Sequence, residues 1–334
     1  MSQAFSPAKQ CERRLATVAV LWIAFLAWPL LAGNDYVLSL GVYFFINLLL
    51  IGGLNLLMGF GGQISLCQAG FFGLGAYVSG VLSVRAGWPP HAGVAAALIL
   101  STVSALAIGL PALRLRGNYL AMATLGFNAI LTVLFTELVG LTGGPNGLSG
   151  IPPIILAGVD FGSPQRFYYL AWAAGGLCMA LLAVFLSSRA GRALRAVAAS
   201  EVAAASMGIN AFNAKLLAFM FSAGAAGLAG ALYAHFNQYA SPETFNFSAS
   251  VLIVVMVALG GWGQYWGPIF GAAVFTAVPE LLHKFQDAEL LVFGAGMIVV
   301  LLFLPQGIAG CVAPIATRIA AGMTLLARTR ATRP

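Results

Sequence analysis

Charged side chains are scarce in this chain. Asp, Glu, Lys and Arg make up only 7% of its 334 residues, whereas 60% are hydrophobic, and the mean hydropathy is +0.94. Soluble domains usually contain about 25% charged residues, so a water-soluble globule of this composition would have too little polar surface to cover itself. The composition therefore excludes a soluble enzyme, a nucleic-acid-binding domain and a disordered linker, and it indicates that the bilayer is the solvent.

Signatures of catalytic and cofactor sites are missing as well. The four cysteines, Cys11, Cys67, Cys178 and Cys311, have neither CxxC nor metal-ligand spacing, so we expect no disulfide framework. The three histidines form no HExxH motif, no Ser lies in a GxSxG elbow, and no GxxxxGK(S/T) loop is present. We therefore expect no metal, cofactor or catalytic residue in this chain, although residues far apart in sequence can still meet in a membrane enzyme.

Apolar segments recur along the whole chain, and a spanning helix needs about 20 such residues. We expect ten crossing helices, at about 15–32, 36–58, 63–84, 91–110, 119–140, 166–187, 216–238, 248–263, 266–283 and 290–304. The Gly-rich stretches 59–75 and 258–271 are the weak places, and either can hold a broken or re-entrant helix where protein or a cavity satisfies its backbone. Small residues at every fourth position, as in Ser222, Ala226 and Gly230, are expected to let helices pack closely.

Basic residues predict the orientation. The first segment follows Arg13 and Arg14 but lacks a small-residue cleavage site at 31–34, so we expect a retained helix rather than a signal peptide. If the N-terminus is cytoplasmic and every segment crosses, 13 of the 16 Lys and Arg residues lie inside. The sequence therefore predicts an all-α polytopic membrane protein with about ten transmembrane helices and both termini cytoplasmic.

This topology divides the chain into parts. The N-terminal segment 1–14 and the tail 305–334 are expected in the cytoplasm, on either side of a transmembrane domain at 15–304. Inside that domain, 188–215 is expected as a cytoplasmic loop and 141–165 as an outer loop. The outer loop is rich in Gly and Pro, so it cannot form a regular helix.

Acidic residues deep in the membrane are typical of ion-coupled carriers, because they bind the transported cation or proton. Most of the nine acids here fall in loops or at helix ends, and Glu137 and Glu280 lie near the outer ends of their segments. This distribution places the energy source outside the chain. An ion-coupled secondary transporter stays open as the alternative from another class.

The long cytoplasmic loop at 188–215 contains a short helix. Residues 192–207 are rich in Ala and lack Gly and Pro, which favours a helix, and Gly208 is expected to end it as a C-terminal cap. Arg192 and Arg195 lie in its first part and Glu201 lies later. Such a helix either lies on lipid head groups through its arginines or docks into a cleft of a partner, and composition does not separate these two.

The same loop resembles the coupling loop of ABC-importer permeases, in the variant found in the high-affinity branched-chain amino-acid importers. The resemblance begins with 191–196, 201–204 and 207–210. Further blocks follow in order and cover most of the chain: 54–66, 70–77, 115–121, 124–127, 141–152, 241–245, 259–261, 266–268 and 303–307. Together they resemble the longer permease of a heterodimeric pair.

The resemblance implies a multi-subunit importer of the bacterial inner (plasma) membrane, in contact with membrane lipid and not with nucleic acid. It implies a second permease subunit, two ABC ATPase subunits that hold ATP and Mg²⁺, and a periplasmic substrate-binding protein. It also implies a set of residues in contact with the ATPases: Arg192, Arg195, Glu201, Ala203, Ala204 and Gly208.

The expected substrates are branched-chain or hydrophobic amino acids, namely leucine, isoleucine and valine. An ABC permease for urea, short amides or aromatic acids is the alternative. Polar residues within apolar segments are candidates for the translocation path, namely Asn55, Gln63, Gln68 and Asn128. Hydrogen bonds between helices are an equally open role for them. The outer segments 141–165 and 241–247 are expected either to contact the binding protein or to serve as connectors.

Overall fold

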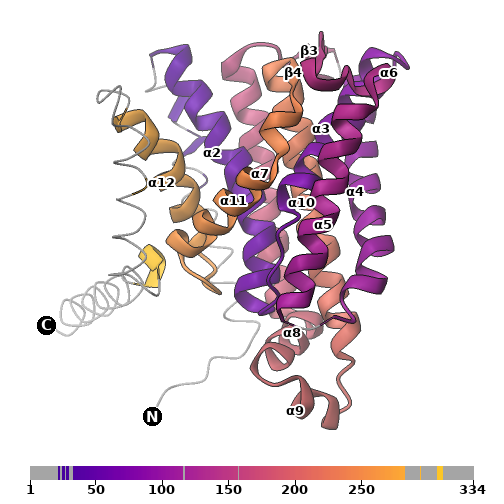
Figure 1. The fold of residues 1–334 in the computed structure, drawn as a ribbon. Coiled ribbons are helices and arrows are strands. Elements are labelled where there is room, and N and C mark those ends of the chain that lie inside the picture. Colours follow the sequence, from indigo (N-terminus) through magenta and orange to yellow (C-terminus); the bar gives the residue numbers. More distant parts are fainter. Residues whose placement is uncertain are drawn as a thin grey trace, which may run out of the picture.

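The computed structural model of this protein describes residues 33–282 except 116 and 157, together with 22, 25, 26, 28, 29, 294 and 307–310. Helices dominate this part, and they form one bundle with a small helical projection at one end (Figure 1). The elements are α2 (Asp35–Leu54), the π-helix η1 (Asn55–Phe60), α3 (Gln68–Val84), α4 (Pro90–Ala112), α5 (Asn118–Glu137), α6 (Val139–Thr142), η2 (Gly144–Asn146), β1 (Leu148–Ser149), β2 (Ile155–Leu156), β3 (Val159–Asp160), α7 (Pro164–Ser187), α8 (Arg189–Ala199), α9 (Glu201–Ser206), α10 (Ala211–Asn237), β4 (Tyr239–Ala240), η3 (Pro242–Phe245), α11 (Phe247–Gly260) and α12 (Gly267–Leu282).

Five helices of the described part are long and apolar enough to cross a bilayer: Asp35–Phe60, Pro90–Ala112, Asn118–Glu137, Pro164–Ser187 and Ala211–Asn237. Three further apolar helices are shorter: Gln68–Val84, Phe247–Gly260 and Gly267–Val278. The chain is therefore an all-α, multi-pass membrane protein. Most of the expected first and last crossing segments, and of the two terminal segments, lies outside the described residues.

Helix α10 is the central element of the bundle, and it packs against α3, α4 and α2. The close packing depends on its small residues. A Cβ atom at Gly230 would overlap the carbonyl oxygen of Phe72, and one at Gly75 would overlap that of Gly227. Small residues at helix contacts let backbones approach closely in a membrane, so the predicted role of the run through Ser222 and Gly230 is confirmed.

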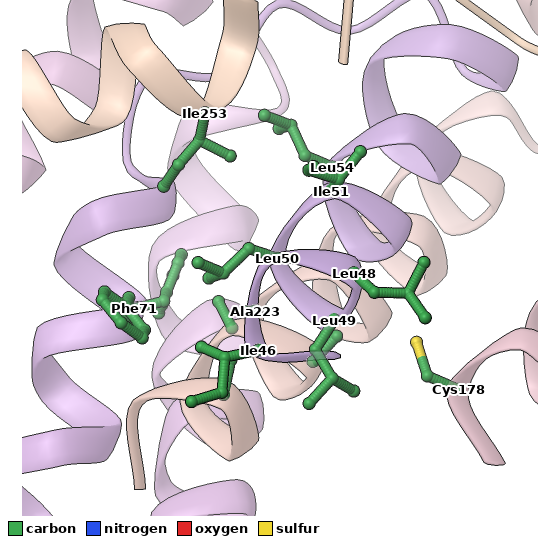
Figure 2. Close-up of a cluster of buried hydrophobic side chains, with 14 of the residues drawn as sticks. Ile46, Leu48, Leu49, Leu50, Ile51, Leu54, Phe71, Cys178, Ala223 and Ile253 are labelled. Atoms are coloured by element: carbon green, nitrogen blue, oxygen red, sulfur yellow. The ribbon is translucent and has the colours of Figure 1, made fainter. Parts of the chain in front are cut away.

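Helix α2 is buried on every side along its second half. Figure 2 shows Ile46, Leu48, Leu49 and Ile51 pointing in different directions around this helix, toward side chains of other helices. The neighbours include Phe71 of α3, Cys178 of α7, Ala223 of α10 and Ile253 of α11. A helix that is apolar all round belongs in the core of a bundle. Cys178 is a free, buried thiol.

The Gly-rich stretch 59–75, where the sequence left a continuous or a broken helix open, is broken. The π-helix η1 ends at Phe60, residues 62–67 are not helical, and α3 begins at Gln68. The Gln68 side-chain amide donates to the Ser222 carbonyl near the middle of α10, so α3 begins deep inside the bundle. The expectation of one helix over 63–84 is therefore wrong in its first part, because the Gly-rich chain turns back and enters the bundle in an extended form.

The second weak place, 258–271, is also interrupted. Helix α11 ends at Gly260, residues 261–266 form a turn, and α12 runs back along α11. With 14 residues, α11 is about 21 Å long, shorter than the roughly 30 Å of a hydrocarbon core. The segment expected to cross at 248–263 thus contains a helix shorter than that core, and it forms a hairpin with α12.

The end of the bundle opposite α8 and α9 is covered by short elements (Figure 1). Strand β1 pairs with β4 in antiparallel register, with Leu148 opposite Ala240, and β2 pairs with β3. Segment 141–165 contains the end of α6, then η2, β1, β2 and β3, before α7 begins at Pro164. The prediction that it forms no regular helix is confirmed except for its first two residues, in α6, and its last two, in α7.

Candidate functional site

The helical projection at one end of the bundle consists of α8 and α9, between the spanning helices α7 and α10 (Figure 1). The sequence predicts one helix over 192–208, and this is wrong in detail: α8 begins at Arg189, and the helix breaks at Ser200. Ser200 has an extended backbone (φ −163°, ψ 114°), and its hydroxyl accepts a hydrogen bond from the Ala203 amide. Serine is a strong N-cap, and this local bond outweighs the helix propensity of the alanines around it.

The end of α9 matches its prediction. Gly208 adopts φ +76°, the left-handed conformation that favours glycine. Its amide donates to the Ala205 carbonyl at 3.0 Å, and the Ile209 amide donates to the Ala204 carbonyl at 3.1 Å. This pair of bonds is a Schellman motif, so the predicted cap is confirmed. The motif reverses the chain directly into α10.

An ion pair ties α9 to α10. The Lys215 ammonium donates to the Glu201 carboxylate at 3.0 Å, and this is the one salt bridge among the described residues. The Lys215 side chain is only 5% exposed, whereas that of Glu201 is 37% exposed. A buried ammonium needs a counter-ion, so Glu201 fixes the first turn of α9 against the start of α10. Sequence reasoning missed Lys215; its position within an otherwise apolar helix was the available signal.

Arg192 and Arg195 hold the corner between α7 and α8. Arg192 Nη1 donates to the Ser187 carbonyl at 2.8 Å, and Arg195 Nη2 donates to the Leu186 carbonyl at 2.9 Å. Both carbonyls lie at the C-terminal end of α7, where the helix dipole favours a positive charge. The two arginines therefore stabilise the position of α8 relative to α7.

The outer surface of α9 is apolar. Val202 is 79% exposed and Met207 is 81% exposed, next to the exposed Ala203, whereas Ala204 faces inward. Large apolar side chains at this exposure on a short helix outside the bundle form a candidate contact surface. Val202 and Met207 were not among the predicted site residues, although two such residues in a polar loop were readable from the sequence.

Two of the four predicted path residues form hydrogen bonds between elements. Asn55 Nδ2 donates to the Gln264 carbonyl at 2.8 Å, and Asn55 Oδ1 accepts from the Gly263 amide at 3.1 Å. Asn55 thus holds the turn between α11 and α12 against η1. Gln68 Nε2 donates to the Leu50 carbonyl at 3.1 Å, and Gln68 Oε1 accepts from the Ser222 hydroxyl at 3.0 Å. Both side chains are buried and satisfied.

The other two path residues differ from these. Gln63 is half-buried in the non-helical segment before α3. Asn128 lies on the face of α5 that packs against α3, and it is only 1% exposed. Neither of its side-chain amide atoms has a hydrogen-bond partner in the described part. An unsatisfied buried amide is costly, so of the predicted residues Asn128 has the strongest chemical reason to meet a polar solute or water.

Metal ligands do not gather anywhere in the described ranges: no group of three or more His, Cys, Asp and Glu residues comes together there. His235 is buried between Ser79, at 2.7 Å from its Nε2, and the Pro152 carbonyl, at 2.7 Å from its Nδ1. This histidine links α3 and α10 to the outer segment 141–165. The arrangement is a structural network rather than a ligand set.

Long apolar helices around a Gly- and Ala-rich central helix, with a capped helix pair that presents an apolar surface outside the bundle, define a multi-pass membrane protein with a contact surface at one end. The family model described as "Branched-chain amino acid transport system / permease component" matches residues 36–301. The chain belongs to this family of transport permeases.

Relatives support the same assignment. The chain is 32% identical to the high-affinity branched-chain amino acid transport system permease protein LivM of Salmonella typhimurium and to that of Escherichia coli. Each alignment covers 89% of this chain and 75% of the relative. It is 26% identical to the permease protein LivH of Escherichia coli, over 77% of this chain and 89% of LivH. No solved structure matches the chain.

Proposed function

We propose that this chain is one of two permease subunits of an ATP-driven importer for branched-chain amino acids, leucine, isoleucine and valine. The similarity to LivM is higher and longer than the similarity to LivH, which supports the role of the longer subunit in a pair. The complete transporter also contains two separate ATPase subunits, which bind ATP and Mg²⁺, and a periplasmic binding protein. The chain lies in the bacterial inner membrane with ten crossings, and the α8–α9 end faces the cytoplasm.

The observation that carries this proposal is the construction of α9. A helix held by a serine cap, a glycine cap and a partly buried ion pair presents Val202 and Met207 outside the bundle. Such a rigid, apolar surface suits insertion into a cleft on an ATPase subunit. The docking surface is thus Val202, Ala203 and Met207, with Glu201, Ala204 and Gly208 holding it in place.

Movement of the α8–α9 pair reaches the membrane part by two routes. The ion pair between Glu201 and Lys215 links α9 to the central helix α10. Helix α8 lies against the broken segment, because Leu194 and Ala198 are the nearest side chains around Gly61 and Gly62. Arg192 and Arg195 keep α8 on the end of α7, so the pair moves as a lever rather than as a loose loop.

The translocation path passes Asn128 on this proposal. Its unsatisfied amide offers a donor and an acceptor within an apolar bundle, which suits the ammonium or carboxylate group of a passing amino acid. Asn55 and Gln68 act as structural ties, while Gln63 lies in the broken segment next to α8. Selection among solutes resides mainly in the binding protein, and the outer segments 141–165 and 241–247 are its docking surface.

Uptake measurements test the proposal. The chain is reconstituted into proteoliposomes with its copurifying subunits and the binding protein, with ATP on the side of the ATPases and no ion gradient. We expect leucine, isoleucine and valine to accumulate only with hydrolysable ATP, ahead of urea, short amides and aromatic acids. Uptake by the chain alone under a proton or sodium gradient, indifferent to ATP, would instead establish an ion-coupled carrier.

A further inference from the structure

A basic groove lies on the flank of the α8–α9 end, between α8 and the first turns of α10. Its volume is about 640 Å³, within the range of small-molecule and lipid sites. Its lining is mostly apolar, with alanines, Ile209 and Leu217, and it also includes Arg189, Arg192, Asn210 and Asn213. Of these residues, only Arg192 has a role assigned above, at the corner between α7 and α8 and in the expected ATPase contact.

The charge of the groove is uncompensated. The described acid on the α8–α9 pair, Glu201, is already bound to Lys215, and neither Arg189 nor Arg192 forms an ion pair with any acid that the structure describes. Arg192 donates one N–H to the Ser187 carbonyl, and the remaining guanidinium N–H groups of both arginines can donate to a ligand. Guanidinium groups of this kind match the geometry of phosphate oxygens.

The position of the groove matches the boundary of a leaflet. Helix α7 ends at Ser187 and α10 begins at Ala211, so the two arginines lie where two spanning helices leave the membrane. Leu217 lies two turns further into α10 and is 47% exposed, and Leu181 and Val184 of α7 are also exposed. The groove therefore leads from a basic end at head-group depth to an apolar surface at acyl-chain depth.

We propose that this groove binds one anionic phospholipid of the inner leaflet, with its phosphate on Arg189 and Arg192 and an acyl chain along Leu217. Basic pockets between helices on the cytoplasmic side are a recognised chemistry for anionic lipid head groups. The assignment to the inner leaflet rests on the proposed orientation, whereas lipid binding itself is measured without transport. A bound lipid would join α8 to α10 beside the ion pair and would stiffen the lever.

Native mass spectrometry of the purified complex tests this proposal. The complex is titrated with phosphatidylglycerol or with phosphatidylcholine of identical chains. We expect one phosphatidylglycerol to be retained in preference to phosphatidylcholine. Arg189→Gln should weaken it about fivefold, and the double variant with Arg192→Gln by tenfold or more. Arg85→Gln, an exposed arginine at the opposite end, is the matched control and should change nothing.

Asn213→Glu provides a variant that leaves the arginines and their corner intact. Asn213 is exposed, and a carboxylate there would offset one of the two arginine charges and repel a phosphate, so the preference for phosphatidylglycerol should fall sharply while thermal unfolding stays unchanged. Retention of phosphatidylglycerol in both Arg189→Gln and Asn213→Glu would overturn the proposal. So would displacement by millimolar inorganic phosphate, which indicates a soluble-anion site, or binding only after the ATPases are removed, which indicates that the groove belongs to a protein interface.

Discussion

Removing the Glu201 carboxylate is the sharpest perturbation of the α8–α9 pair, which we propose moves as a lever on the membrane part. In Glu201→Gln the Lys215 ammonium, 5% exposed, loses its charged partner. Breaking a fully buried ion pair costs about 3–5 kcal/mol. Because Glu201 is 37% exposed and the lysine stem can move its head group toward water, we expect a smaller cost of about 2 kcal/mol, located at the contact between α9 and α10.

A double-mutant cycle isolates the contribution of the ion pair between Glu201 and Lys215 to the free energy of unfolding. Lys215→Met keeps the length of the side chain and removes the buried charge, so it should cost less than about 1 kcal/mol. The double variant should regain most of the stability that Glu201→Gln loses, because no buried charge is left unpaired. The assays are thermal unfolding of the complex and hydrogen exchange of the 201–206 amides.

The same variants separate stability from coupling. If the pair transmits force, the double variant will be stable but will hydrolyse more ATP per leucine imported than the wild type. The reasoning is refuted if Glu201→Gln leaves both exchange and unfolding unchanged, or if the two single effects simply add in the double variant.

Four further changes test other contacts. Asn128→Leu removes two unsatisfied polar atoms, so it should raise unfolding stability by about 1–3 kcal/mol while it lowers leucine uptake; a loss of stability would show that the amide is satisfied. Gln68→Leu should destabilise by about 2–4 kcal/mol in the same unfolding assay, because it leaves buried groups on α2 and α10 unpaired. Gly230→Ala should reduce the yield of folded protein by wedging α3 from α10, whereas Gly126→Ala, with open space around it, should not. Gly208→Ala should cost about 1 kcal/mol through its left-handed backbone and speed exchange in α9 about fivefold.

Features of the fold that depend on local chemistry were predictable from the sequence. Apolar runs indicated the membrane class, the glycines of 59–75 marked a weak place in the helix pattern, and Gly208 indicated the end of α9. The run through Ser222 and Gly230 revealed close packing, because the absence of a Cβ is a property of the residue itself.

Features that depend on distant contacts, or on competition between two local preferences as at Ser200, were not predictable. Ser200 interrupts a stretch of high helix propensity, since a single capping bond outweighs several alanines. Whether a buried amide is satisfied depends on the opposite helix, and this separates Asn128 from Asn55 and Gln68 only in three dimensions.

The most direct test of the central claim is to measure ATP hydrolysis and leucine uptake together in proteoliposomes that contain Val202→Asp and Met207→Asp. Both side chains are about 80% exposed, so the changes should leave unfolding of the membrane part unaltered. We predict that ATP-driven uptake falls at least tenfold, because the surface of α9 is no longer apolar and no longer binds the ATPase subunit. Uptake equal to that of the wild type would contradict the account.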